Sequence, residues 1–398
     1  MRTNLKILAP IVIVGTFLCG LVWWKLQPIE IVAADYSALT NWKETALVTS
    51  FETFKKSCDA FLKQSPETEV GTVNFPMKAA DWQPACQAAL NLKEVDEPKL
   101  HDFFERWFKL VRFSQHKPLD GLFTGYYLPL LHGAWQPSER YKYPIWGRPQ
   151  ELITVNLESF GITADKKSIT GRLAGKKLVP YYSRAEINEG KMSSTSTPLL
   201  WVDNRVDRFF LEIQGSGYVQ MEDGSNIAIG YAAQNGRPYT SIGKYLIQKG
   251  ELEKKAVSMQ SIREFLNTHA ERVDEVLNQN ESFIFFRLLK HQQILGSQGV
   301  ALTAGYSLAV DKSHIPLGTP IWLETSFPTQ NSTQPAALKR LMVAQDTGGA
   351  IKGWVRGDVF WGGGEEASYI AGHMKNKGTF WLFLPRSTQF NDIGKRNQ

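Results

Sequence analysis

The chain has 398 residues, of which 43% are hydrophobic and 21% are charged, and its formal net charge is +6. This composition excludes a disordered chain, and the length favours two domains, or one domain with a large insertion. The positive charge allows an acidic polymer as a partner, but it is too weak and too evenly spread to indicate nucleic acid. The 12 Trp and 13 Tyr residues could form surfaces that stack on sugars, or could simply add to the core.

The first 25 residues predict a signal segment or a membrane anchor. Two basic residues, Arg2 and Lys6, precede an uncharged apolar run over residues 7–24. The run is intermediate in length between a signal-peptide core and a membrane span of about 20 residues. Cys19 lies inside it and could be lipidated, but Leu18 stands where a lipoprotein signal has a small residue, so an uncleaved anchor is favoured. In either case the rest of the chain is expected to be exported.

Residues 42–64 predict a helix, because hydrophobic residues such as Phe51 and Phe54 recur at intervals of three and four. The helical pattern continues, with interruptions, to about residue 113. Two cysteines, Cys58 and Cys86, fall on these predicted helices. In an oxidising compartment they could form one disulfide, and two buried free thiols are the alternative.

The periodicity then changes from helical to strand-like. Residues 121–131 predict a strand, and residues 135–149 are rich in turns. Residues 150–290 predict short strands and turns, with a hairpin at Asp223-Gly224 and one helix at about 258–278.

After residue 280 strands predominate again, and residues 364–376 predict the last helix, with Gly378 as its C-terminal cap. The polar tail after Pro385 is expected to be loose. Many short strands and few helices indicate a β-barrel-like body, and no internal repeat is evident.

Three kinds of catalytic or binding site find no support. In the glycine-rich run over residues 344–364, Lys352 precedes Gly353 and no Ser or Thr follows, so a phosphate-binding loop is excluded. The histidines are scattered without ligand spacing, so neither a metal nor another cofactor is predicted. Ser216 lies between glycines, but Gln214 stands where a nucleophile elbow needs Gly. The glycines here would instead let the backbone approach a ligand closely.

Two carboxylates in the glycine-rich run remain as candidates. Asp346 ends an apolar strand, and Asp358 precedes the apolar residues Val359, Phe360 and Trp361. An apolar environment would desolvate Asp358, raise its pKa and keep it protonated, as a general acid requires. The alternative for either residue is a turn cap beside glycines.

Seven segments in chain order resemble the motifs of the membrane-bound lytic murein transglycosylase A family. They are "GLFTGYYLPLL", "PSERYKYPIWGRP", "PYYSRAEINEG", "FFLEIQGSG", "GYAAQNGRPYTSIGKYLI", "SLAVDKSHIPLGTPIWL" and "AQDTGGAIKGWVRGDVFWGGGEEASYIAGHMKNKG". The resemblance runs from about residue 100 to 386.

The resemblance implies a mainly β protein with N-terminal helices. A double-psi β-barrel domain would hold a second, β-barrel-like domain as an insertion, with a groove between the two. The implied divisions are an anchor (1–25), a helical segment with the first part of the barrel domain (30–130), the inserted β domain (131–288), the rest of the barrel (289–386) and a loose tail (387–398).

The resemblance also implies an activity. The family cleaves the β-1,4 bond between N-acetylmuramic acid and N-acetylglucosamine in peptidoglycan and forms 1,6-anhydromuramoyl ends. Its three characteristic aspartates match Asp311, Asp346 and Asp358, and its single catalytic acid/base matches Asp358. Asp346 would then support the site and Asp311 would brace the barrel. The residues that would line the groove and bind substrate are Thr124, Tyr126, Tyr127, Gln214, Gly215, Ser216 and Gly217.

The implied partners are peptidoglycan strands, a membrane through the N-terminus and cell-wall synthases, and not nucleic acid. The implied location is the periplasm, anchored either as an outer-membrane lipoprotein or through an inner-membrane segment. Two other functions stay open, a hydrolytic glycosidase on a related glycan and a non-catalytic peptidoglycan-binding scaffold.

Overall fold

The computed structural model of the chain describes residues 28–93, 95–162, 168–192, 194–290 and 293–390. The anchor predicted over residues 1–25, with Cys19, lies outside these ranges. Within them, no helix combines the length and the apolar character that a membrane crossing requires.

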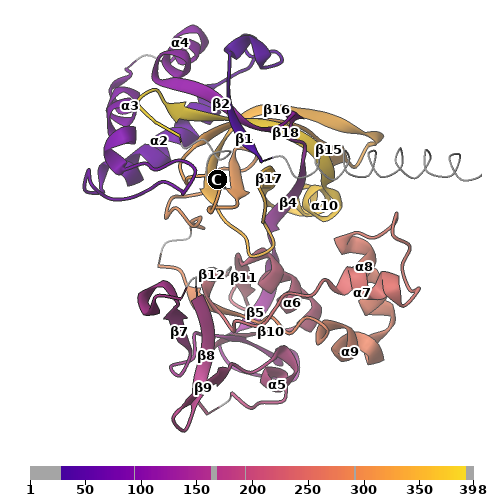
Figure 1. The fold of residues 1–398 in the computed structure, drawn as a ribbon. Coiled ribbons are helices and arrows are strands. Elements are labelled where there is room, and N and C mark those ends of the chain that lie inside the picture. The colour runs from indigo at the N-terminus through magenta and orange to yellow at the C-terminus, as the bar shows by residue number, and fades with distance from the viewer. Residues whose placement is uncertain (1–27, 94, 163–167, 193, 291–292, 391–398) are drawn as a thin grey trace, which may run out of the picture.

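Six strands in the described part of the chain close into a barrel, which forms the upper half of the molecule in Figure 1. Around the ring the order is β4–β17–β14–β16–β15–β18, and β18 pairs again with β4. The pairs β14–β16 and β17–β4 are parallel. The bounds are β4 (Gly121–Leu128), β14 (Ser307–Val310), β15 (Pro320–Thr329), β16 (Ser332–Asp346), β17 (Arg356–Gly363) and β18 (Lys375–Pro385).

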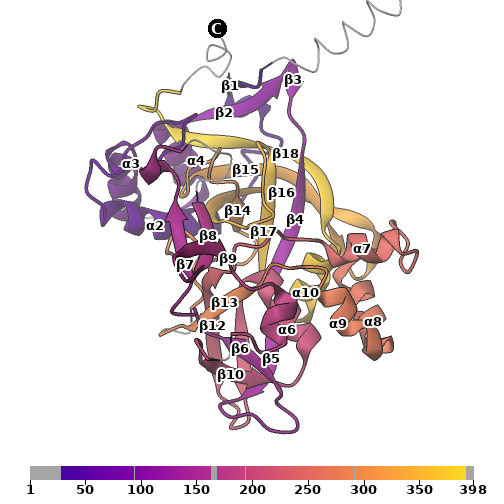
Figure 2. The ribbon, with the colours of Figure 1, turned by 60° about the horizontal axis from the view of Figure 1, so that its bottom comes forward.

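Three further strands extend the barrel at β18. Strand β2 (Phe108–Gln115) pairs with β18, and β1 (Glu30–Ala34) and β3 (Lys117–Pro118) pair with β2. Directly after β3, β4 runs from the barrel toward the second half of the molecule (Figure 2).

A second sheet forms the lower half, in the order β13–β12–β11–β5–β10–β6. An isolated parallel bridge between Gly147 and Phe286 joins its two edges, so the sheet is nearly closed. Its strands are β5 (Leu130–Ala134), β6 (Tyr143–Trp146), β10 (Pro198–Val202), β11 (Ser216–Met221), β12 (Asn226–Gln234) and β13 (Ile284–Leu288). A separate three-stranded sheet contains β7 (Ile153–Asn156), β8 (Ser168–Ala174) and β9 (Lys177–Pro180).

Three N-terminal helices pack on one side of the barrel (Figure 1). They are α2 (Val48–Leu62), α3 (Ala79–Asn91) and α4 (Glu97–Trp107), and their buried aromatic residues share one core with the barrel strands. The Ser50 hydroxyl donates to the Leu341 carbonyl of β16 over 2.7 Å. Cys58 of α2 and Cys86 of α3 are fully buried and joined by a disulfide.

The remaining helices belong mostly to the inserted half. They are α5 (Arg184–Asn188), α6 (Arg205–Gln214), α7 (Ile242–Gln248), α8 (Met259–Thr268), α9 (Val273–Leu277) and, on the barrel, α10 (Glu365–His373). Short 3-10 turns lie at Tyr36–Ala38, Glu158–Phe160 and Ala270–Arg272.

Two predicted helix boundaries in the N-terminal part are wrong. The first helix begins at Val48 rather than 42, because the Glu97 carboxylate of a later helix accepts from the Leu47 N–H over 2.7 Å. The helical pattern predicted to residue 113 ends at Trp107, and the next residues form β2 between β1 and β18. Both corrections come from partners that are distant in sequence.

The inserted half is more helical than predicted. The run "FFLEIQ", expected as strand, belongs to α6, where Asn204 caps the first turn and Gly215 ends the helix at φ +80°. The helix predicted at 258–278 is divided at His269 into α8 and α9. The hairpin at Asp223-Gly224 is confirmed between β11 and β12.

The end of the last helix also differs from the prediction. Helix α10 ends at His373, and Gly378 is not its cap but part of β18, opposite Gly121. A Cβ at Gly378 would come within 2.5 Å of the Glu324 carbonyl oxygen, so the close packing of the strands requires glycine here. The predicted fold class, a mainly β protein with N-terminal helices, a closed barrel and a second, nearly closed inserted sheet, is confirmed.

Candidate functional site

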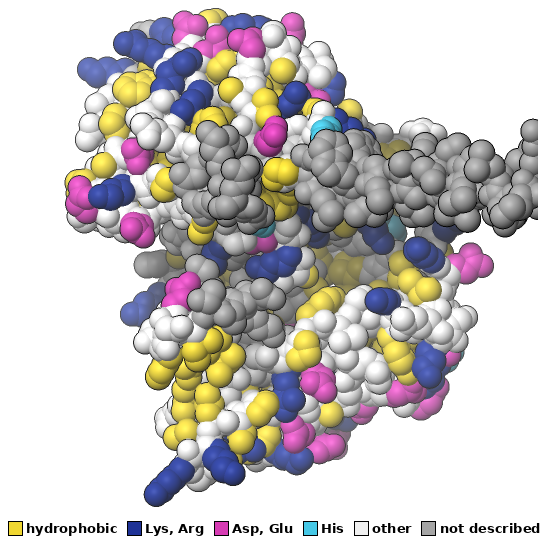
Figure 3. Space-filling view, in the orientation of Figure 1, with side chains coloured by type: hydrophobic (Ala, Val, Ile, Leu, Met, Phe, Trp, Pro, Cys, Tyr) yellow, Lys and Arg dark blue, Asp and Glu magenta, His cyan; other side chains and the backbone are white. Residues whose placement is uncertain are grey.

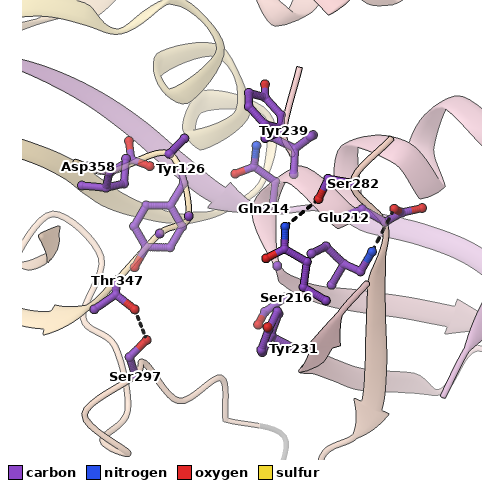
Figure 4. Close-up of a pocket in the computed structure, with 18 of the residues that line it drawn as sticks. Tyr126, Glu212, Gln214, Ser216, Tyr231, Tyr239, Ser282, Ser297, Thr347 and Asp358 are labelled. Carbon is purple, nitrogen blue, oxygen red and sulfur yellow. Dashed lines mark hydrogen bonds between the residues drawn. The ribbon is translucent and has the colours of Figure 1, made fainter. Parts of the chain in front are cut away.

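A groove separates the barrel from the inserted half. It holds a cavity of about 1420 Å³ that is lined by residues of both halves. In Figure 4, Asp358 and Tyr126 of the barrel lie on one side of this cavity, and Gln214, Ser216 and Tyr231 lie on the other. The space-filling view shows the molecule narrowing between its halves, with some Lys and Arg side chains exposed there (Figure 3).

Asp358 lies on β17, opposite Thr124 of the neighbouring strand β4. The Thr124 hydroxyl donates a hydrogen bond to the Asp358 carboxylate. Burial raises the pKa of Asp358 to about 6, and the nearby charge of Asp346 adds to the rise. The Thr124 hydrogen bond and the positive charge of Arg356 oppose it. A carboxyl group with this pKa can exist in both protonation states near neutral pH, as an acid/base catalyst requires.

Arg356 fixes the direction of the Thr124 hydroxyl. Its Nη2 donates to Thr124 Oγ1 over 2.8 Å, and its Nη1 donates to the carbonyls of Leu122, over 3.0 Å, and Gly357. Because Thr124 Oγ1 accepts from Arg356, its own proton is directed to Asp358. The chain Arg356–Thr124–Asp358 therefore holds the carboxyl group in one orientation on the groove wall.

Asp346, at the end of β16, accepts hydrogen bonds on both oxygens. Its Oδ2 accepts from the Tyr126 hydroxyl over 2.8 Å. Its Oδ1 accepts from the Ser297 N–H and hydroxyl over 2.9 and 2.8 Å, and from the Thr347 N–H over 2.8 Å. Burial, followed by the charge of Asp346, raises the pKa of Tyr126 well above its ordinary value, so the tyrosine remains a donor. The hydrogen bonds of Asp346 therefore hold Tyr126, Ser297 and Thr347 in place around Asp358.

Asp311 does not line the cavity but holds a loop that does. Its Oδ2 accepts from the Gly353 N–H over 2.9 Å, and its Oδ1 accepts from the Ser313 hydroxyl over 2.7 Å. Burial acts to raise the pKa of Asp311, but these hydrogen bonds outweigh it and lower the pKa below the ordinary value. The carboxylate connects β14 to the segment after β16, whose residues 347–351 line the groove.

Five of the seven residues predicted to line the groove do so, namely Thr124, Tyr126, Gln214, Gly215 and Ser216. Tyr127 and Gly217 are buried beside it instead. Strand alternation explains the position of Tyr127, because it follows the groove-lining Tyr126 on β4 and faces the opposite side. Gly217 instead packs against the backbone before β5, where a Cβ would come within 2.7 Å of the Pro129 carbonyl oxygen. The Tyr127 N–H still contributes, since it donates to Gln214 Oε1 over 3.0 Å and so fixes that side chain at the groove.

A buried ion pair supports the wall on the inserted side. Arg184 of α5 donates to both carboxylate oxygens of Glu212 of α6, over 3.1 and 2.7 Å. Their side chains are 2% and 1% exposed. Arg184 also donates to the backbone carbonyls of Asn280 and Ser282. The pair thereby fixes two helices and the segment before β13 around the groove.

Two family descriptions match successive parts of this chain. Residues 122–287 match the family described as the MltA specific insert domain, and residues 306–384 match the 3D domain. The crystal structure of MltA from Neisseria gonorrhoeae in its monoclinic form is 33% identical, with a TM-score of 0.75 over 92% of this chain and 94% of that chain.

The chain belongs to the MltA family. Membrane-bound lytic murein transglycosylase A of Escherichia coli strain K12 is 36% identical over 263 residues, which are 65% of this chain. The matched region spans 64% of the length of that relative. The structure of E. coli MltA with bound chitohexaose is 28% identical, with a TM-score of 0.63 over 90% of this chain and 95% of that chain.

Several members of the site were not predicted from the sequence, among them Arg356, Ser297 and the Arg184–Glu212 pair. Arg356 stands two residues before Asp358, and residues i and i+2 of a strand share one face, so the motif "RGD" contained the signal. Ser297 contacts Asp346 across 49 residues of chain and follows no motif. It could have been found only from the fold.

Proposed function

We propose that this protein is a lytic transglycosylase that cleaves the β-1,4 bond between N-acetylmuramic acid and N-acetylglucosamine in peptidoglycan and leaves 1,6-anhydromuramoyl ends. Membership of the MltA family supports this function, as do the names of the relatives. The groove, with a cavity of about 1420 Å³, is large enough for several sugars of a glycan strand.

One observation carries the proposed mechanism. Among the described residues that line the groove, the acidic ones are Glu212, Asp346 and Asp358. Glu212 is held in the ion pair with Arg184, and Asp346 accepts four hydrogen bonds. Asp358 is therefore the carboxyl group that is available to exchange a proton with a substrate. Hydrolytic glycosidases generally use two carboxyl groups, whereas this groove supplies one.

One carboxyl group suffices if the substrate supplies its own nucleophile. In the first step Asp358 donates its proton to the glycosidic oxygen, and the bond from the muramic acid C1 to that oxygen breaks. The C6 hydroxyl oxygen of the same sugar then bonds to C1, and its proton passes to the Asp358 carboxylate. Asp358 ends protonated, as it began, and no water is consumed. Attack from within one sugar replaces a bimolecular step, which favours ring closure.

Digestion of purified peptidoglycan with the full chain tests this proposal. Mass spectrometry of the fragments should find ends that are lighter by one water than reducing ends. Reducing ends would instead indicate a hydrolytic glycosidase, and the absence of any cleavage would indicate a non-catalytic scaffold protein.

The pH dependence of kcat/KM should report the protonation of Asp358. Because a general acid must be protonated, kcat/KM should fall as the pH rises above about 6. The Asp346 charge contributes to the raised pKa of Asp358, so Asp346→Asn should move this alkaline limb to lower pH. The measurement is kcat/KM between pH 4 and 9 for the two proteins.

Asp311→Asn is the matched control for the pH experiment. Asp311 lies outside the groove and does not contribute to the pKa of Asp358. This variant should lower activity, because Asp311 holds the loop that lines the groove, but it should leave the pH of the alkaline limb unchanged. A limb that stays in place in Asp346→Asn, or moves to higher pH, would contradict the electrostatic coupling of the two groove aspartates.

The proposal includes a location and a domain division. The enzyme would face peptidoglycan in the periplasm and be held to a membrane by residues 1–25, either through a lipid on Cys19 or through a retained segment. Mass spectrometry of the native N-terminus distinguishes these two forms. The barrel would comprise residues 30–130 and 289–386, the inserted domain residues 131–288 and the tail residues 387–398.

A further inference from the structure

A second, smaller cavity of about 520 Å³ adjoins the groove on the inserted half. Arg287 of β13 lines both cavities, so the two spaces meet at this side chain. Arg148, which follows β6, also lines the smaller cavity. Among its described lining residues none is acidic, and several carry hydroxyl or amide groups, namely Gln150, Thr195, Ser196 and Thr197.

The fold places the two arginines side by side. The bridge between Gly147 and Phe286 is parallel, so Arg148 and Arg287 are the next residues on two adjacent backbones. Adjacent strands lie about 4.8 Å apart, and residues at equivalent positions point to the same face. This bridge joins segments that are 139 residues apart in the sequence.

Both guanidinium groups are available to a ligand. Both side chains are exposed, and Arg148 donates one hydrogen bond to the Leu152 carbonyl over 3.3 Å. Within the described residues, neither arginine has a carboxylate at ion-pair distance. The nearby Glu151 accepts instead from the hydroxyls of Tyr181 and Thr195.

Arg148 is also close to the groove itself. Tyr231 lines the groove, and burial raises the pKa of its hydroxyl, while the positive charge of Arg148 opposes that rise. Two positive charges without a carboxylate partner among the described residues therefore lie where the groove and the smaller cavity share a lining residue. Two guanidinium groups bind a carboxylate through hydrogen bonds in which both partners are charged, which the uncharged hydroxyl groups of a glycan cannot form.

We propose that Arg148 and Arg287 form a subsite for the free carboxylates of the peptide stems that branch from the glycan strand. The inference rests on the proposed function, because only a stem-bearing glycan in the groove would place an acidic peptide here. Each stem leaves the glycan sideways through its muramic acid, so the small cavity takes the branch while the groove takes the sugars. The subsite would make binding selective for peptidoglycan with charged stems.

Binding experiments in an Asp358→Asn background test this proposal without consuming the substrate. The ligands are glycan fragments of one length with native stems, with stems whose carboxylates are amidated, and with stems removed. Arg148→Gln with Arg287→Gln should bind the native fragment about tenfold more weakly than the parent, and amidation should weaken the parent by a similar factor. On the amidated fragment, the double variant should have the same affinity as its parent. The same should hold on the stem-free fragment.

Arg140→Gln is the matched control, because Arg140 is an exposed arginine of the inserted half, with a side chain that is 68% exposed, and it lines neither cavity. It should bind all three fragments as the parent does. The subsite would be overturned if the double variant bound native and amidated fragments equally more weakly than the parent. It would also be overturned if the loss of affinity persisted on stem-free strands, which carry a carboxylate only next to the sugar. If the wild-type enzyme forms no anhydro ends but the charge-dependent binding is found, the proposed reaction fails and the subsite stands.

Discussion

Asp358→Asn should reduce kcat for peptidoglycan cleavage by about a hundred- to ten-thousand-fold, the usual range for the loss of a general acid/base. The amide can neither protonate the leaving oxygen nor accept the C6 hydroxyl proton. The Thr124 hydroxyl can still donate to the new side chain, so the groove wall should keep its shape. The measurement is the rate of release of soluble anhydro fragments from purified peptidoglycan.

The variant should remain folded, which separates loss of chemistry from loss of structure. Burial raises the pKa of Asp358 from an ordinary 3.8 to about 6, so the charged form is disfavoured in the folded protein. Stability is therefore lost as the pH rises from about 4 to about 6, and Asn removes this cost. The Tm of the variant at pH 7.5 should equal or exceed that of the wild type. Undiminished release of fragments would reject Asp358 as the catalyst.

Arg184→Met should lower the free energy of unfolding by about 3–5 kcal/mol, the usual result when one partner of a buried ion pair is removed. Glu212 would be left charged and almost fully buried, with Arg208, whose Nε lies 3.8 Å from Glu212 Oε1, as its remaining cationic partner. The backbone carbonyls of Asn280 and Ser282 would lose their donors as well. Chemical denaturation of the two proteins at one pH measures the difference.

Replacing both partners provides the control for this stability prediction. Arg184→Met with Glu212→Leu removes the carboxylate that has lost its bidentate partner, so the double variant should regain part of the lost stability. Recovery should be incomplete, because the two backbone carbonyls still lack a donor and the buried Arg208 loses its carboxylate partner. A single variant that loses less than about 1 kcal/mol would show that the pair does not hold the inserted wall together.

Sequence predictions were mostly correct where the structure is set by neighbouring residues, and mostly wrong where it is set by residues that are distant in the sequence. The hairpin at Asp223-Gly224 was predicted because its turn is set by adjacent residues. Helix α6 was missed because a short apolar run such as "FFLEIQ" fits a buried strand as well as a helix. What decides is the cap at Asn204 and the left-handed Gly215. Strand β2 was taken for helix because its partner β18 lies more than 260 residues away in the sequence.

For the candidate site, too, the sequence determined some features and the tertiary structure determined others. The sequence by itself determined that an aspartate precedes an apolar strand, that glycines surround it, and that the motifs are those of one family. Only the tertiary structure decided which carboxylates are free. The hydroxyl that binds Asp358 lies 234 residues away, and the tyrosine that binds Asp346 lies 220 residues away. Protonation depends on burial and on neighbouring charges, and closure of the barrel brings both to these carboxylates.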